Sequence, residues 1–260
     1  MELKDYVAAQ KDFRDVFVLD VHGHIGTECT CQLGAYDADS IAHTVTRLGV
    51  NAICVSAITS LRSDFKLGND HVAEACAAHP GVILGYASPT PFYDYDLSKY
   101  FEADRGFRGI KIHGNMQGET PENDPRYDKA YELANRLHLP VLFHAWMPYE
   151  VEHALDVARR YPDLTVILGH SGLTMLASKE NAIAGCKKYD NVMVDTAISG
   201  TYDGAIEWIV DKVGEDRVCY GSDMAFFECD HTLGKVAMTK LSDTAKEKIL
   251  GLNVKSLFGF

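Results

Sequence analysis

Short apolar runs alternate with segments of helical periodicity along almost the whole chain. The apolar runs are rich in Val and Ile, which predicts buried strands. They are VFVLDVH at 16–22, NAICVSAI at 51–58, VILGYAS at 82–88, GIKIHG at 109–114, PVLFHA at 140–145, TVILGH at 165–170, NVMVDTA at 191–197 and RVCYGSD at 217–223. Between them, the spacing of apolar residues predicts helices at 40–48, 69–79, 97–102, 127–137, 151–161, 182–188 and 204–213.

This repeat of strand and helix predicts an α/β fold with a parallel sheet. About eight such units in 260 residues fit a single (β/α)8 TIM barrel, whose strands are buried on both faces and therefore read as continuous apolar runs. An open, doubly wound sheet is the competing arrangement. Because no linker, low-complexity tract or short-period repeat interrupts the pattern, we expect one domain over residues 1–260.

Polar residues lie at or near the end of most predicted strands, and this favours the barrel, because active sites of such barrels lie at the C-terminal ends of the strands. His22 and His24 close the first strand two residues apart, so strand alternation places both on one face. The other polar residues of this kind are Lys111, His113, His144, His170, Asp195 and Asp223. An unpaired buried imidazole or carboxylate is costly, so we expect these side chains to meet.

The types of these side chains indicate a metal centre. Four of them could share one divalent ion through imidazole nitrogens and a carboxylate: His22, His24, His144 and Asp223. Such a nitrogen-rich set favours Zn²⁺, with Mn²⁺, iron or cobalt as alternatives. A water bound to such an ion can have its pKa lowered to about 7, which supplies hydroxide at neutral pH. We expect His170 and Asp223 to move protons in the reaction.

Composition narrows the choice of partner and compartment. A formal net charge of -12 argues against a nucleic-acid surface, which needs clustered Lys and Arg. No stretch approaches the roughly 20 apolar residues that span a bilayer, and the charged N-terminus does not resemble a signal peptide. Seven cysteines without a C-x-x-C pair give no disulfide framework or structural zinc site. We therefore expect a cytoplasmic protein that acts on a small-molecule substrate and that could form a homo-oligomer.

Taken together, the motifs resemble those of the amidohydrolase superfamily, in particular the amidohydrolase-related branch that includes aminocarboxymuconate semialdehyde decarboxylase. The matching segments are DVHGH at 20–24, LFHA at 142–145, LGHSG at 168–172 and YGSDM at 220–224. The tail EKILGLNVKSLFGF at 247–260 is similar to the closing helix of that branch, with Asn253 and the pair Leu257 and Phe258 in the family pattern. The resemblance covers nearly the whole chain and implies the barrel fold.

The resemblance also assigns roles to residues. It matches the four residues named above to the metal ligands and His170 to the catalytic histidine of single-metal members. In two-metal members a lysine on the fourth strand is carboxylated and bridges two ions, and Lys111 raises that alternative. Because the segment GIKIH is also common in single-metal relatives, we prefer one ion.

We expect a metal-dependent hydrolase that acts on a small amide, ester or lactone through metal-bound hydroxide. The first alternative is non-oxidative decarboxylation of a small unsaturated or aromatic carboxylate. The second is a non-catalytic metal-binding protein. Decarboxylation would require a cation beside the leaving carboxylate, which makes Arg62 and Lys111 candidates for substrate binding. His113 and Trp146 are further candidates for contact with the substrate.

Other residues keep two interpretations each. Alternation places Asp20 with His22 and His24, where it could orient a ring or simply end the strand. Asp195 could contact substrate or bond loop amides, and we favour the structural role. Arg108 is a weaker candidate for a substrate carboxylate than Arg62. Aromatic residues after the strand ends could cover the site or pack under loops: Trp146, Tyr149, Phe226 and Phe227.

Overall fold

A computed structural model describes residues 2–27, 37–102, 104–172, 176–197 and 203–260. Its strands form one parallel sheet of eight in chain order, as the repeat predicted. They are β1 (Leu19–Ile25), β2 (Ala52–Ala57), β3 (Ile83–Ala87), β4 (Phe107–Ile112), β5 (Pro140–His144), β6 (Thr165–Gly169), β7 (Val192–Asp195) and β8 (Val218–Cys219). Nearly every residue of these strands is buried, because helices cover the outside and side chains fill the inside.

The last strand is short, but the chain beyond it still closes the barrel against β1. The amide of Val21 donates to the carbonyl of Tyr220 at 3.0 Å, and the amide of Asp223 donates to the carbonyl of His22 at 2.7 Å. A parallel bridge also joins Gly23 and Met224. The fold is therefore the (β/α)8 barrel that the sequence predicted, with a seam where the first and last strands meet.

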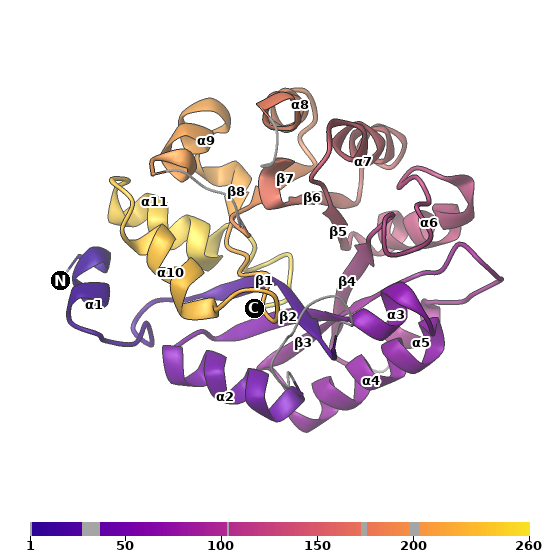
Figure 1. Ribbon diagram of the computed structural model, residues 1–260, viewed down its shortest axis with the longest axis horizontal. Coiled ribbons are helices and arrows are strands. Elements are labelled where there is room, and N and C mark those ends of the chain that lie inside the picture. Colours follow the sequence, from indigo (N-terminus) through magenta and orange to yellow (C-terminus); the bar gives the residue numbers. More distant parts are fainter. Residues whose placement is uncertain (1, 28–36, 103, 173–175, 198–202) are drawn as a thin grey trace.

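Helices surround the sheet (Figure 1). Those of eight residues or more are α2 (Ala38–Leu48), α4 (Phe65–Ala78), α6 (Asp128–Leu137), α7 (Pro148–Arg160), α8 (Leu176–Lys188), α9 (Ala205–Val213) and α10 (Cys229–Ala237). The shorter ones are α1 (Leu3–Ala8), α3 (Ile58–Arg62), α5 (Ser98–Phe101) and α11 (Asp243–Glu247), with short 3-10 turns η1 (Pro125–Tyr127), η2 (His170–Gly172) and η3 (Glu215–Arg217) and a π turn η4 (Lys248–Leu252).

Four helices, α2, α4, α7 and α8, begin earlier than the apolar spacing indicated, and N-cap side chains account for this in α2 and α4. The carboxylate of Asp37 accepts the amide of Ser40, and that of Asp64 accepts the amide of Leu67. A cap satisfies amides of the first turn that have no partner within the helix. The apolar pattern starts only where a helix meets the sheet, so it underestimates the length of the helix.

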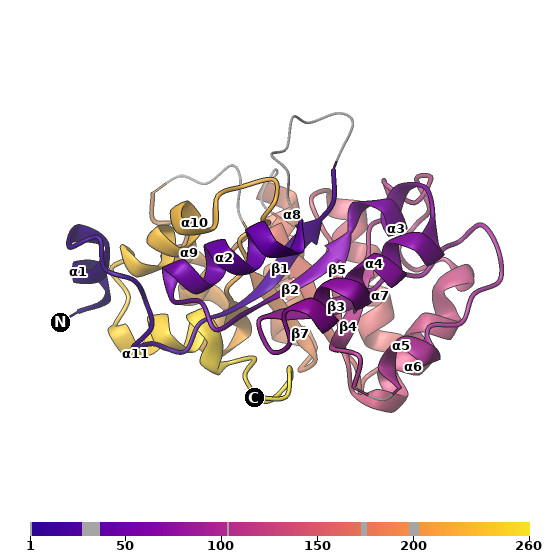
Figure 2. The same cartoon turned by 90° about the horizontal axis from the view of Figure 1, so that it is seen from below.

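The barrel interior is apolar at the end where the strands begin. Its side chains come from seven strands and from the C-terminal segment: Leu19, Val21, Ala52, Cys54, Leu84, Tyr86, Leu142, Ile167, Met193, Cys219, Val254 and Phe258. The ring of Phe258 meets that of Tyr86 edge-on at 6.2 Å, so the C-terminal segment, marked C in Figure 2, closes this end. Asn253 anchors the segment through bonds to the carbonyls of Glu215 and Val218. Among the described residues, no helix is long and apolar enough to cross a membrane.

Candidate active site

The polar strand ends meet at the other end of the barrel interior. A register shift between Asp20 and Gly23 breaks the alternation of β1 at this point. Asp20 lies just before this shift, opposite Ile53, and its Oδ1 accepts the backbone amides of His22 and Ser222 at 3.1 and 3.0 Å. The expectation that Asp20 shares a face with both histidines is wrong, because simple alternation does not survive a bulge.

Three imidazoles surround the carboxylate of Asp223. Its Oδ1 lies 3.5 Å from Nε2 of His22 and 3.3 Å from Nε2 of His24, and its Oδ2 lies 4.0 Å from Nδ1 of His170. Potential ligand atoms of His22, His170 and Asp223 all lie within 4.8 Å of one another. Ligands about 2.1 Å from one tetrahedral ion lie about 3.4 Å apart, so the spacing suits a shared cation.

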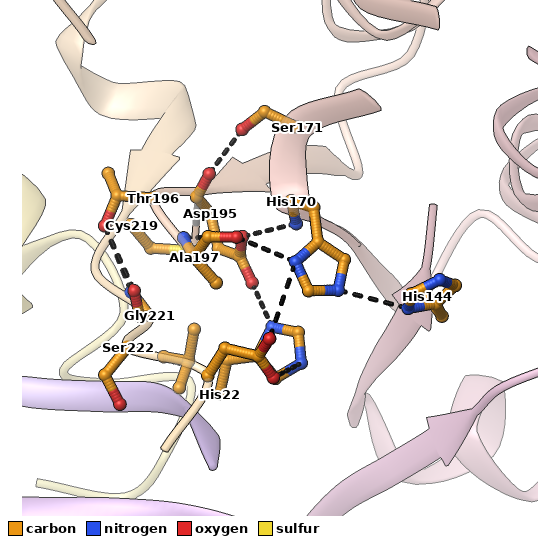
Figure 3. A network of polar contacts seen from close by, with 12 residues as sticks. His22, His144, His170, Ser171, Asp195, Thr196, Ala197, Cys219, Gly221 and Ser222 are labelled. Carbon is orange, nitrogen blue, oxygen red and sulfur yellow. Dashed lines mark hydrogen bonds and ion pairs between the residues drawn. The ribbon is translucent and has the colours of Figure 1, made fainter. Parts of the chain in front are cut away.

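His144 lies next to this group and is linked to it through His170. Nε2 of His170 is 3.1 Å from Nδ1 of His144, as Figure 3 shows. The ring of His113 stacks on that of His144, with centroids 3.9 Å apart and an angle of 8° between the planes. Trp146 contacts both His144 and His170, at centroid distances of 5.3 and 5.5 Å. The fourth, fifth and sixth strands thus contribute a continuous aromatic wall.

Lys111 lies at the centre of the group. It projects from β4 into the interior and is fully buried, and its Nζ is 3.0 Å from Nε2 of His22. Burial lowers its pKa, and the charges of Asp223 and Asp195 partly restore it. The side chain therefore brings a cation, or a neutral amine, to the same point that the candidate metal ligands face.

Burial keeps the imidazoles of the site neutral at neutral pH. It lowers the pKa of His24, and it lowers those of His22, His113 and His144 well below the ordinary value. The pKa of His170 falls to about 4 through burial, although the charge of Asp223 opposes the shift. A neutral imidazole has a free lone pair, so these rings are in the state that binds metals.

Asp195, at the end of β7, has a larger part in the site than the sequence indicated. Its Oδ2 lies 2.7 Å from Nδ1 of His22, while its Oδ1 accepts the amides of His170 and Ala197. Burial raises the pKa of this carboxyl, and the two amide donors oppose that shift. Its position at a strand end had identified it from the sequence, and its expected bonds to loop amides are present, but the contact with the ring of His22 was not predicted.

The backbone at two of the strand ends has an unusual conformation. His170, Ser171 and Asp223 have φ angles of 63°, 50° and 61°. Residues other than glycine rarely adopt this left-handed conformation, and it is often found at functional sites. Here it turns the chain sharply enough to direct His170 and Asp223 toward the same point.

Some candidates lie away from this group. Arg108 belongs to the first half of β4 and pairs with Asp104 near the C-terminal segment, at the opposite end of the barrel, so it is wrong as a substrate residue for this site. Arg62 ends α3 at an exposed position, near enough for its charge to act with burial in lowering the pKa of His113. Phe226 meets the ring of His24 at 5.3 Å, whereas Tyr149 is largely exposed. Cys29 and Cys31, the two cysteines nearest to each other in the sequence, lie outside the described residues.

Comparisons with known proteins also point to an enzyme of the amidohydrolase type. The model of a protein family described as amidohydrolase matches residues 57–260. The gamma-resorcylate decarboxylase of Rhizobium sp. (strain MTP-10005) is 24% identical, over 81% of this chain and 81% of its own.

Solved structures share the fold. A putative amidohydrolase from Staphylococcus aureus superposes with a TM-score of 0.75 at 19% identity, covering 94% of this chain and 99% of its own. The 5-carboxyvanillate decarboxylase of Novosphingobium aromaticivorans, in complex with manganese and 4-hydroxy-3-methoxy-5-nitrobenzoic acid, does so with a TM-score of 0.72 at 16% identity, covering 95% and 97%.

Proposed function

Because the chain belongs to the amidohydrolase family, we propose that it is a metal-dependent enzyme that removes a carboxyl group, without oxidation, from a small aromatic or unsaturated acid. The observation that carries this proposal is the fully buried Lys111 amine, 3.0 Å from His22 in the group of metal-binding side chains. A carboxylate substrate needs a cation beside it, and Lys111 offers one inside the site.

The donor set fits one divalent ion. Its proposed members are His22, His24, His144 and Asp223. His170 is an alternative to one of the histidines, because potential ligand atoms of His22, His170 and Asp223 lie within 4.8 Å of one another. The nitrogen-rich set favours zinc, whereas the related 5-carboxyvanillate decarboxylase holds manganese. When bound, the ion would supply positive charge to hold the substrate and stabilise the charge that develops on it.

The side chains themselves would bind the substrate and move the proton. Lys111 would pair with the substrate carboxylate, assisted from the rim by Arg62, and the rings of His113 and Trp146 would lie along a planar substrate. The bond between the substrate carbon and the carboxyl carbon breaks, carbon dioxide leaves, and the electron pair remains on the substrate carbon. Nδ1 of His170 lies 2.7 Å from the carbonyl of Ala197, so Nε2 holds the lone pair. His170 would first take up a proton from solvent at Nε2 and then deliver it to that carbon.

The hydrolysis that the sequence suggested first would use the same side chains. Decarboxylation is favoured over it because the curated relative reported above is a decarboxylase and because the buried Lys111 amine, 3.0 Å from His22, offers a cation to a substrate carboxylate. The third expectation, a protein without activity, does not explain why His170 lies so close to His22 and Asp223.

The test is an assay with separate detection of the two products. Protein loaded with Zn²⁺ or Mn²⁺ is incubated with hydroxylated benzoic acids, lactones and amides, while released carbon dioxide and released acid are measured in parallel. We expect carbon dioxide from at least one aromatic acid, and loss of that activity in Lys111→Met. Acid release from lactones or amides, without carbon dioxide from any acid, would return the assignment to hydrolysis.

A further inference from the structure

Asp195 contacts both the ring of His22 and the backbone of His170, as Figure 3 shows. It is completely buried, and its two carboxylate oxygens have different partners. Oδ2 lies 2.7 Å from Nδ1 of His22, and Oδ1 accepts the amides of His170 at 2.7 Å and of Ala197 at 3.1 Å. One carboxylate thus connects β1 to the turn after β6.

The contact with His22 determines which ring nitrogen carries the proton. A carboxylate can only accept hydrogen bonds, so Nδ1 of His22 must donate and Nε2 keeps its lone pair. That Nε2 faces Asp223 at 3.5 Å, which is the direction of the proposed ion. Gly221 makes the contact possible, because a Cβ there would lie 2.8 Å from Cβ of His22 and 3.1 Å from Oδ2 of Asp195.

The contacts with the two amides fix His170 in a comparable way. The left-handed backbone of His170 and Ser171 is held by the bond from the His170 amide to Asp195. Ala197, held through its own amide, presents its carbonyl 2.7 Å from Nδ1 of His170. Nδ1 of His170 therefore donates, and its Nε2 is left with the lone pair. The carboxylate thus contacts the ring of His22 directly and acts on the ring of His170 only through the backbone of His170 and Ala197.

We propose that Asp195 is a positioning residue that holds His22 in the tautomer with a free Nε2 and holds His170 in place beside it. The consequence for metal binding rests on the proposed function, whereas the consequence for the tautomer of His22 does not. In Asp195→Asn, the amide oxygen can still accept both backbone amides, but the amide nitrogen would stand where Oδ2 was. It would donate to Nδ1 of His22, and the proton would move to Nε2.

Asp20→Asn provides a matched control. Asp20 is also a fully buried carboxylate beside His22, with a pKa that burial raises to about 7, but it contacts the backbone of His22 rather than the ring. Both of its amide bonds end on Oδ1, which asparagine retains. Both substitutions therefore replace a fully buried carboxyl group by an amide. Asp195→Asn changes a contact with the ring of His22, whereas Asp20→Asn changes one with its backbone.

The experiment measures tautomers and metal affinity in the full chain. Nitrogen NMR of ¹⁵N-histidine protein without metal, with His22 assigned through His22→Gln, should show the proton on Nδ1 in the parent and in Asp20→Asn, and on Nε2 in Asp195→Asn. Competition with a fluorescent chelator should show Zn²⁺ affinity lowered about 10–100-fold in Asp195→Asn, the usual effect of losing such a partner, and little changed in Asp20→Asn.

A proton on Nε2 of His22 in the parent protein would overturn the proposal without any variant, so it remains testable if Asp195→Asn does not fold. Equal Zn²⁺ affinity in the parent and Asp195→Asn, at an unchanged tautomer, would also overturn it. A parent protein that binds no divalent ion but shows the expected tautomers would refute the proposed function and leave the positioning role supported.

Discussion

The two ends of the barrel interior are built from the same strands but contain opposite kinds of side chain. Where the strands begin, residues such as Leu19, Leu84 and Phe258 fill the interior with apolar groups. Where they end, the interior holds buried polar side chains: His22, His24, His113, His170, Lys111 and Asp223. The region that stabilises the fold and the region that carries the proposed chemistry therefore lie only a few residues apart along each strand.

The difference shows what each end contributes to the free energy of folding. Burial of apolar side chains stabilises the barrel, whereas burial of charged and polar ones costs free energy unless they are paired. At the C-terminal end that cost appears as a raised pKa of Asp20 and a lowered pKa of Lys111. Substitutions at the two ends should therefore affect different measurements.

The largest expected effect is at the centre of the polar end. Asp223→Asn removes a carboxylate that faces three imidazoles, and we expect the purified protein to lose its metal and its activity to fall by more than 10⁴-fold, beyond the usual contribution of one acid–base group. Metal analysis and product assay measure both. Asp216→Asn, at an exposed ion pair with Lys248, should change neither. Full metal content in Asp223→Asn would contradict the proposed ligand set.

His170→Asn should come next. If the ring moves a proton and one ion is held by the other side chains, turnover should fall by about 10²–10⁴-fold while one metal equivalent remains. His138→Asn is a matched control, because His138 also has left-handed backbone, with φ of 54°, but is exposed at the end of α6. Loss of the metal in His170→Asn would instead make His170 a ligand.

At the apolar end, Phe258→Ala should reduce stability rather than chemistry. The ring is 1% exposed and closes the interior beside Tyr86, so its removal should cost about 3–5 kcal/mol in urea unfolding. Phe260→Ala is the control, because that ring is 44% exposed and should contribute much less. Activity per folded molecule should be unchanged. A Phe258→Ala protein of normal stability but with lost activity would remove the distinction between the two ends.

The smallest effect concerns a carboxyl at the rim of the polar end. Glu122 is buried, with Oε2 2.8 Å from Nδ1 of His153, and burial raises its pKa above the ordinary 4.5. The folded state therefore holds this proton more tightly than the unfolded state, and ionisation destabilises the fold as pH rises above 4.5.

Glu122→Gln cannot ionise, so its stability relative to the parent should increase by about 1–3 kcal/mol between pH 4.5 and 7.5, measured by urea unfolding. Glu132→Gln, on the exposed face of α6, should show no such trend. A difference that is constant with pH would mean that Glu122 ionises normally in the folded protein.

The sequence predicted the barrel because parallel strands buried on both faces leave a simple pattern of apolar runs. It also identified the polar strand ends, since histidines and acids are rarely buried unless they have a partner or a function. It could not place Asp20 correctly, because the register shift in β1 accompanies pairing with the distant segment after β8. The role of Asp195 was underestimated for the same reason: its partners His22 and His170 become neighbours only in the closed barrel.

The seam between β1 and the segment after β8 has a consequence for the order of events during synthesis. The carbonyl of His22 accepts a hydrogen bond from the amide of Asp223, so the pairing of β1 is completed only by the segment that follows β8. A nascent chain that stops before β8 has both early histidines but lacks the carboxylate that faces them. Loading of the proposed ion would then require that the chain has been made at least as far as the segment after β8 and that this segment has paired with β1.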